Sequence, residues 1–171
     1  PRRKIHALSI SDGSERWTHT YETDAIDEAY TAGGTAYVTV TEDRVYYGLG
    51  FASAFGILGP QATADMLEKV RNRLYHGPNV VALDRSSGDV VWRQTLGDQA
   101  RVFQPMVAGP DNLYALYRAV ENPDERSMVH VLDRQDGSVL GSFGPVEPDR
   151  SFAVADGTVY THQQTSVAAW R

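Results

Sequence analysis

The chain has 171 residues, of which 22% are charged and 42% hydrophobic, the composition of a folded domain and not of a disordered segment. Its formal net charge of −6 argues against binding to a nucleic-acid backbone, because neutralising phosphates requires clustered Lys and Arg. There is no Cys, which excludes disulfides, thiolate nucleophiles and Cys-ligated zinc, and no apolar run approaches the ~20 residues of a membrane-spanning helix.

The first predicted element is a β-hairpin, with the strands "KIHALSI" and "SERWTHTY" on either side of Gly13. Apolar and polar residues alternate in both stretches, which is the pattern of a half-buried strand. The polar knot "SDG" between them predicts the turn, and glycine fits there because such turns need a positive φ. The same glycine hairpin recurs around Gly88 and Gly137.

A second kind of strand pair lies between the glycine hairpins. Each copy is an alternating strand, a polar turn and a second strand that contains "VY" or "LY". The copies occupy residues 36–49, 105–117 and 152–164, with turns expected at Glu42–Asp43, Gly109–Asn112 and Asp156–Gly157. The chain ends with "SVAAWR", which matches the first strand of another glycine hairpin.

An insert, residues 48–79, interrupts the second unit between its second and third strands. Its first half is glycine-rich and apolar. Its second half carries Met66, Leu67, Val70 and Leu74 on one stripe, which predicts a helix near 61–75. Two interpretations remain open: the insert binds a partner or ligand, or its helix covers a sheet edge above the apolar loop.

Taken together, the pattern predicts a single all-β domain over residues 1–171, with two, four, four and three strands in successive units. One four-stranded unit is about as long as the ~40–45 residues of a propeller blade. We therefore expect a β-propeller segment of four-stranded antiparallel blades, about three blades plus partial ones, with one helical insert. An immunoglobulin-like sandwich would not explain the recurring hairpin.

The stretch "ALDRSSGDVVW" carries a family resemblance. It resembles the tryptophan-docking motif of pyrroloquinoline-quinone-type propeller repeats, which runs Ala-x-Asp-x-x-Thr-Gly-x-x-x-Trp between the third and fourth strands of a blade. Ala82, Asp84, Gly88 and Trp92 match this motif, and Ser87 stands in place of Thr. A Trp at this point can pack between neighbouring blades, provided that its N–H finds an acceptor.

Two further copies match in part. The first keeps Ala7, Gly13 and Trp17, but Ser9 replaces Asp and Asp12 replaces Thr. The third keeps Asp133 and Gly137, whereas Val131 replaces Ala and Gly141 stands where Trp is expected. The resemblance covers most of the chain outside the insert.

The resemblance implies two alternative functions. The first is a non-catalytic propeller module that acts as a protein-interaction or assembly scaffold, and this is the function we expect. The alternative is a fragment of a quinone-dependent dehydrogenase whose active site lies outside this chain. Because three blades cannot easily close a ring, we expect a protein partner, self-association or further blades. The resemblance also implies an exported protein.

No residue is predicted to be catalytic, to bind a cofactor or to ligate a metal. The five histidines show no close metal-ligand spacing; they are His6, His19, His76, His130 and His162. Four aspartates lie in or beside predicted turns, where they are expected to bond local N–H groups; they are Asp12, Asp84, Asp133 and Asp136. Glu121, Asp124 and Glu125 form an acidic loop, for which a solvated surface is the simpler interpretation.

Overall fold

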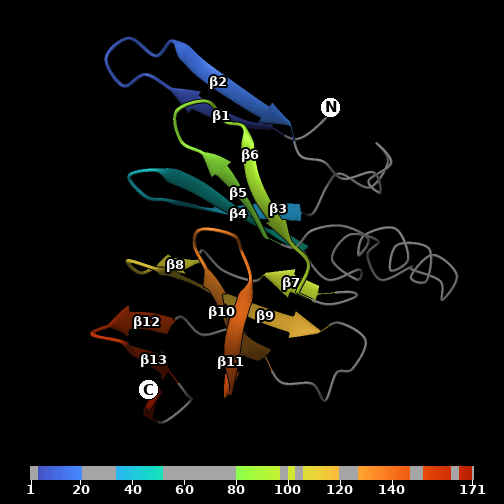
Figure 1. Ribbon diagram of the computed structural model, residues 1–171, viewed down its shortest axis with the longest axis vertical. Coiled ribbons are helices and arrows are strands. Elements are labelled where there is room, and N and C mark those ends of the chain that lie inside the picture. Colours follow the sequence, from blue (N-terminus) through green and yellow to red (C-terminus); the bar gives the residue numbers. More distant parts are fainter. Residues whose placement is uncertain are drawn as a thin grey trace, which may run out of the picture.

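In the part of the chain that the structure describes, four antiparallel sheets follow one another along the longest axis in chain order (Figure 1). The computed structural model describes residues 4–20, 34–51, 80–96, 100–102, 106–119, 127–146, 152–162 and 166–170. Within these ranges all the regular structure is β-strand, so the predicted all-β class is confirmed for the described part of the chain.

The sheets are numbered I to IV. Sheet I pairs β1 (Lys4–Leu8) with β2 (Glu15–Thr20). Sheet II holds, in order, β3 (Gly34–Val40), β4 (Arg44–Phe51), β5 (Val80–Asp84) and β6 (Val90–Gln94). Sheet III holds β7 (Ala100–Val102), β8 (Val107–Ala108), β9 (Asn112–Ala119), β10 (Ser127–Asp133) and β11 (Val139–Val146). Sheet IV holds β12 (Phe152–Ala155), β13 (Thr158–His162) and β14 (Val167–Trp170).

Sheet III has five strands where the sequence predicts four, because its first strand is divided into β7 and β8. Both pieces pair antiparallel with β9: Val102 lies opposite Tyr117, and Val107 lies opposite Tyr114. Val102 and Val107 are five residues apart in the sequence, whereas their partners Tyr117 and Tyr114 are only three residues apart on β9. Pro105 lies in this interval of the sequence and has no N–H to donate to a ladder.

The turns confirm the glycine hairpins predicted from the sequence. Gly13, Gly88 and Gly137 have φ of 72°, 78° and 78°, a region that a residue with a Cβ adopts only at a cost. In each turn the glycine N–H donates to the carbonyl four residues earlier, at 2.8, 2.9 and 3.0 Å. Asp156 and Gly157 both have positive φ, as a two-residue type I′ hairpin requires.

The core lies between the sheets. One apolar cluster joins sheets I and II, a second joins II and III, and a third joins III and IV. Strand β5, "VVALD", is buried on both faces because sheet II is covered on both sides, with Val81 and Leu83 toward sheet I and Val80 and Ala82 toward sheet III. This explains a continuous apolar run where a one-sided sheet would alternate.

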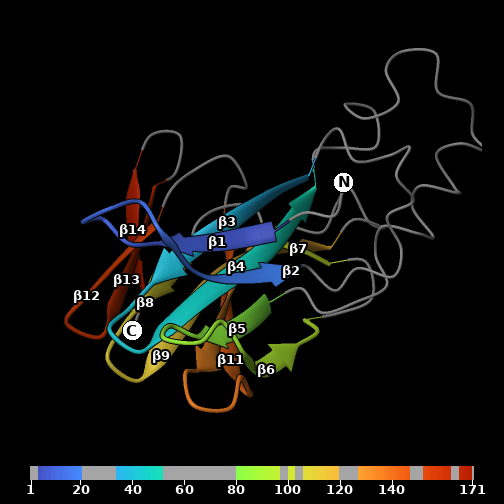
Figure 2. The same ribbon diagram turned by 90° about the horizontal axis from the view of Figure 1, so that it is seen from above.

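Residues that lie opposite one another on neighbouring strands form a row across each sheet, and sheets II, III and IV carry equivalent rows. In sheets II and III this row is on the face toward the following sheet. In sheet II the row is Thr39, Tyr46, Ala82 and Trp92. In sheet III it is Val107, Tyr114, Val131 and Gly141. In sheet IV it is Ala153, Tyr160 and Ala169. Viewed along the stack, the strands of sheets I and IV run in clearly different directions, so the stack turns as it progresses (Figure 2).

The expected insert at 48–79 begins later in the structure than in the sequence prediction. Gly48 pairs with Tyr37 and Val80, and β4 continues through Phe51. The remaining residues, 52–79, lie outside the described residues, and the helix predicted near 61–75 lies there with them.

Candidate functional site

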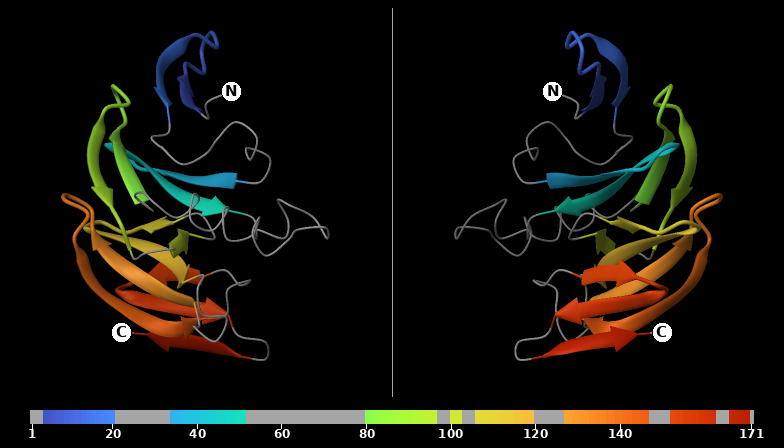
Figure 3. Two further views of the ribbon diagram at one scale, coloured as in Figure 1. Left: turned by 90° about the vertical axis from the view of Figure 1, so that its right-hand side faces the viewer. Right: turned by 90° about the vertical axis from the view of Figure 1, so that its left-hand side faces the viewer.

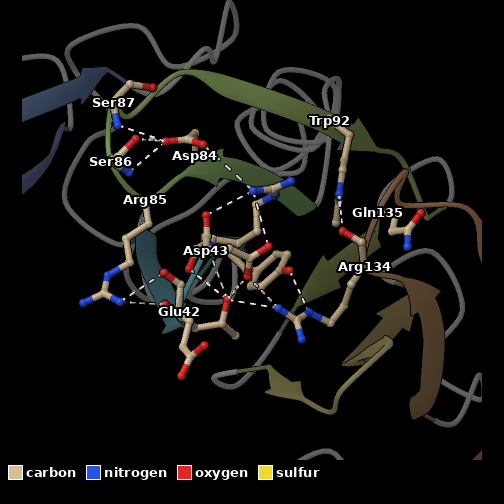
Figure 4. Close-up of polar contacts among 12 residues, drawn as sticks. Glu42, Asp43, Asp84, Arg85, Ser86, Ser87, Trp92, Arg134 and Gln135 are labelled. Atoms are coloured by element: carbon tan, nitrogen blue, oxygen red, sulfur yellow. Dashed lines mark hydrogen bonds and ion pairs between the residues drawn. The ribbon is translucent and has the colours of Figure 1, made fainter.

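A group of polar side chains gathers around the turns of sheets II and III, along an edge of the stack that we call the turn edge (Figure 4). In sheet II the 41–44 turn and the 85–88 turn are adjacent there, because Arg85 N–H donates to the Asp43 carbonyl at 3.1 Å. In sheet III Arg134 N–H donates in the same way to the Asp111 carbonyl at 3.0 Å. Each sheet thus presents a pair of turns to its neighbours.

Trp17 of sheet I docks on the turn of sheet II. Its indole Nε1–H donates to the Arg85 carbonyl at 2.8 Å. The ring lies against Gly88 so closely that a Cβ on this glycine would be 2.6 Å from Trp17 Cε3. Glycine is therefore required twice here, once by its φ and once by the indole.

Trp92 of sheet II repeats this geometry on sheet III. Its Nε1–H donates to the Arg134 carbonyl at 3.0 Å, and a Cβ on Gly137 would be 2.6 Å from Trp92 Cε3. Trp92 is 7% exposed and packs against Tyr46 of its own sheet, with ring centroids 5.8 Å apart. The two docked indoles thus have the same acceptor position, the same glycine contact and the same orientation along the chain.

Sheets III and IV meet without a docked indole. Gly141 occupies the fourth position of the sheet III row, where sheet II has Trp92. Instead Phe143 contacts Trp170 of sheet IV, with ring centroids 6.1 Å apart, and Trp170 donates to Thr161 Oγ1 of its own sheet at 3.1 Å. Trp170 pairs with Val159 as Leu83 pairs with Val45, so it is a core residue of the third strand and not a docking Trp.

Arg134 ties sheet III to sheet II through its side chain. Its Nε donates to the Tyr46 hydroxyl at 3.0 Å, and its Nη2 bonds Asp43 Oδ1 at 2.8 Å and Thr41 Oγ1 at 3.2 Å. The hydrogen bond to Tyr46, together with the nearby Asp43 charge, raises the pKa of Arg134 above its ordinary value. The guanidinium therefore stays charged and holds the two turn edges together.

Arg85 is the equivalent residue of sheet II, and the comparison isolates what Arg134 adds. Both arginines donate through Nη1 to carbonyls of the preceding turn in their own sheet: Arg85 to Thr41 and Glu42, Arg134 to Gly109 and Pro110. In addition, the Arg134 side chain bonds Tyr46, Asp43 and Thr41 of the preceding sheet, whereas the Arg85 side chain bonds only its own sheet among the described residues. Sequence reasoning missed this role, although the dipeptide Asp-Arg at 84–85 and 133–134 was a signal that could have found it.

The turn aspartates are hydrogen-bonded as the sequence predicts. Asp84 Oδ1 accepts from Ser86 Oγ at 2.5 Å and from the backbone N–H of Ser86 at 2.8 Å. These bonds lower the pKa of Asp84, and the side-chain bond from Ser86 has the largest effect. Asp12 and Asp136 accept from the N–H two residues later, which likewise lowers their pKa, and Asp133 accepts from Gln135 N–H at 2.6 Å.

The histidines whose side chains the structure describes, His6, His19 and His130, do not converge. His6 Nδ1 contacts Glu15 Oε2 at 2.8 Å on sheet I, and His19 Nε2 contacts the Tyr47 hydroxyl at 3.2 Å between sheets I and II. His130 is half-buried on sheet III and contacts the Tyr117 ring edge-on, with ring centroids 4.7 Å apart. Burial lowers the pKa of His130. His76 lies outside the described residues, and His162 lies in β13.

Within the ranges that the structure describes, no group of three or more His, Asp or Glu side chains is placed to hold a metal ion. The acidic loop with Glu121, Asp124 and Glu125 lies outside those ranges. The described residues also contain no helix that is both long and apolar enough to cross a membrane. No protein-family model matches the sequence, and no curated protein matches it.

Proposed function

We propose that this chain is a segment of a propeller of the pyrroloquinoline-quinone-like repeat type and that it acts as a non-catalytic scaffold for protein assembly. The observation that carries the proposal is the docking of Trp17 and Trp92 on equivalent turns of the next sheet. One Trp–glycine contact would be a local packing detail. Two contacts in the same register point to a repeating way of joining sheets.

The arrangement of the sheets supports the same proposal. The last strands of sheets II and III, β6 and β11, lie on the same side of the stack (Figure 3). Each sheet turns its cross-strand row toward the next sheet, as blades around a common axis would. The successive change in strand direction fits wedges arranged around an axis better than two layers packed face to face.

The turn-edge polar groups support a structural role. Arg134 of sheet III donates to Tyr46 and Asp43 of sheet II, and Asp84 accepts hydrogen bonds from its own turn. Apolar side chains are exposed on all four sheets: Leu8 on sheet I and Val167 on sheet IV are 57% and 67% exposed, and Val40 on sheet II and Leu140 on sheet III are each 57% exposed. Exposed apolar residues of this kind favour association with another protein, and we propose that the residues on the two end sheets take part in it.

Site-specific photo-crosslinking tests the assembly role. A photoreactive amino acid is placed at Leu8, at Val167 or, as the control, at Val91, an exposed β6 residue away from both ends. We expect protein adducts from the two end positions in an extract of the producing organism, and none from Val91. Adducts from Val91 alone would contradict the assembly role.

Titration with pyrroloquinoline quinone and calcium tests whether this chain itself contributes residues to a quinone site. The scaffold is expected to leave the quinone absorbance spectrum unchanged. Saturable quinone binding by this chain would instead favour a dehydrogenase fragment and would overturn the proposed non-catalytic role.

A further inference from the structure

No further inference is drawn: the strongest candidate, the exposed apolar surface patch that Val139 and Leu140 form on the edge strand β11 of sheet III, carries none, because nothing in the structure shows what covers it.

Discussion

Alanine at Gly137 tests the indole contact directly, and the chain supplies its own control at Gly13. Both glycines occupy the same turn position, with φ of 78° and 72°. A Cβ at Gly137 would be 2.6 Å from Trp92 Cε3 and 2.7 Å from Cδ2, whereas a Cβ at Gly13 would meet nothing within 4 Å. The two substitutions therefore share the backbone strain and differ in the collision with the ring.

The expected magnitudes follow from this difference. Alanine in the left-handed region costs about 1–2 kcal/mol, and both variants bear this cost. Forcing a buried side chain out of a packed position adds about 1–3 kcal/mol. We expect Gly137→Ala to lower the free energy of unfolding by about 2–5 kcal/mol and Gly13→Ala by about 1–2 kcal/mol.

Urea unfolding followed by far-UV circular dichroism and by tryptophan fluorescence measures both values, provided that the two probes give one transition. The double variant Gly137→Ala/Trp92→Leu separates the cost of the collision with the indole from the cost of the backbone strain. Trp92→Leu alone destabilises the protein, because the packing of the indole is lost. In this background, the further loss of stability caused by Gly137→Ala is expected to fall toward that caused by Gly13→Ala. Equal costs of alanine at Gly13 and Gly137 in the wild-type background would refute the docked geometry.

Three further predictions concern the turn edge and the core. Arg134→Ala is expected to lower the free energy of unfolding by about 2 kcal/mol or more, since its side chain is only 16% exposed and bonds Tyr46 and Asp43. Arg85→Ala should lower it by less than about 1 kcal/mol, and urea unfolding of the two variants measures the difference. Burial lowers the pKa of His130, so the unfolded chain binds its proton at a higher pH than the folded chain. Stability is therefore expected to fall as the pH drops below the ordinary His value of about 6.5, and His130→Val should remove this slope, which unfolding curves across the pH range would reveal. Hydrogen bonds lower the pKa of Asp84, so the ionised carboxylate stabilises the fold fully above the ordinary Asp pKa, and this stabilisation is lost as the pH falls through the lowered pKa. If the stability of Asp84→Asn fell with acid as steeply as that of the wild type, this expectation would be contradicted.

The elements were largely predictable from local sequence. Gly13, Gly88 and Gly137 marked their turns because a positive φ leaves few alternatives to glycine. The Asp156–Gly157 pair marked a two-residue hairpin for the same reason. These signals act over a few residues, so one sequence is enough to read them.

The contacts between the sheets were harder to predict. The acceptors of the Trp17 and Trp92 indoles are backbone carbonyls 68 and 42 residues away, and a carbonyl has no signature in the sequence. The reach of Arg134 to Tyr46 depends on how two sheets stack, which the strand pattern does not specify. The division of the first strand of sheet III was missed because alternation predicts where a strand lies and not whether its ladder is continuous.

Nuclear Overhauser effects at the turn glycines test most directly whether the indoles dock on the next sheet. The space that a Cβ would occupy on Gly88 and Gly137 holds an α proton in the natural protein, so this proton lies against the indole. Strong effects are expected from Trp17 Hε3 to Gly88 Hα and from Trp92 Hε3 to Gly137 Hα, with no indole effect at Gly13. Absence of both effects in the folded protein would show that the sheets are not joined by their tryptophans.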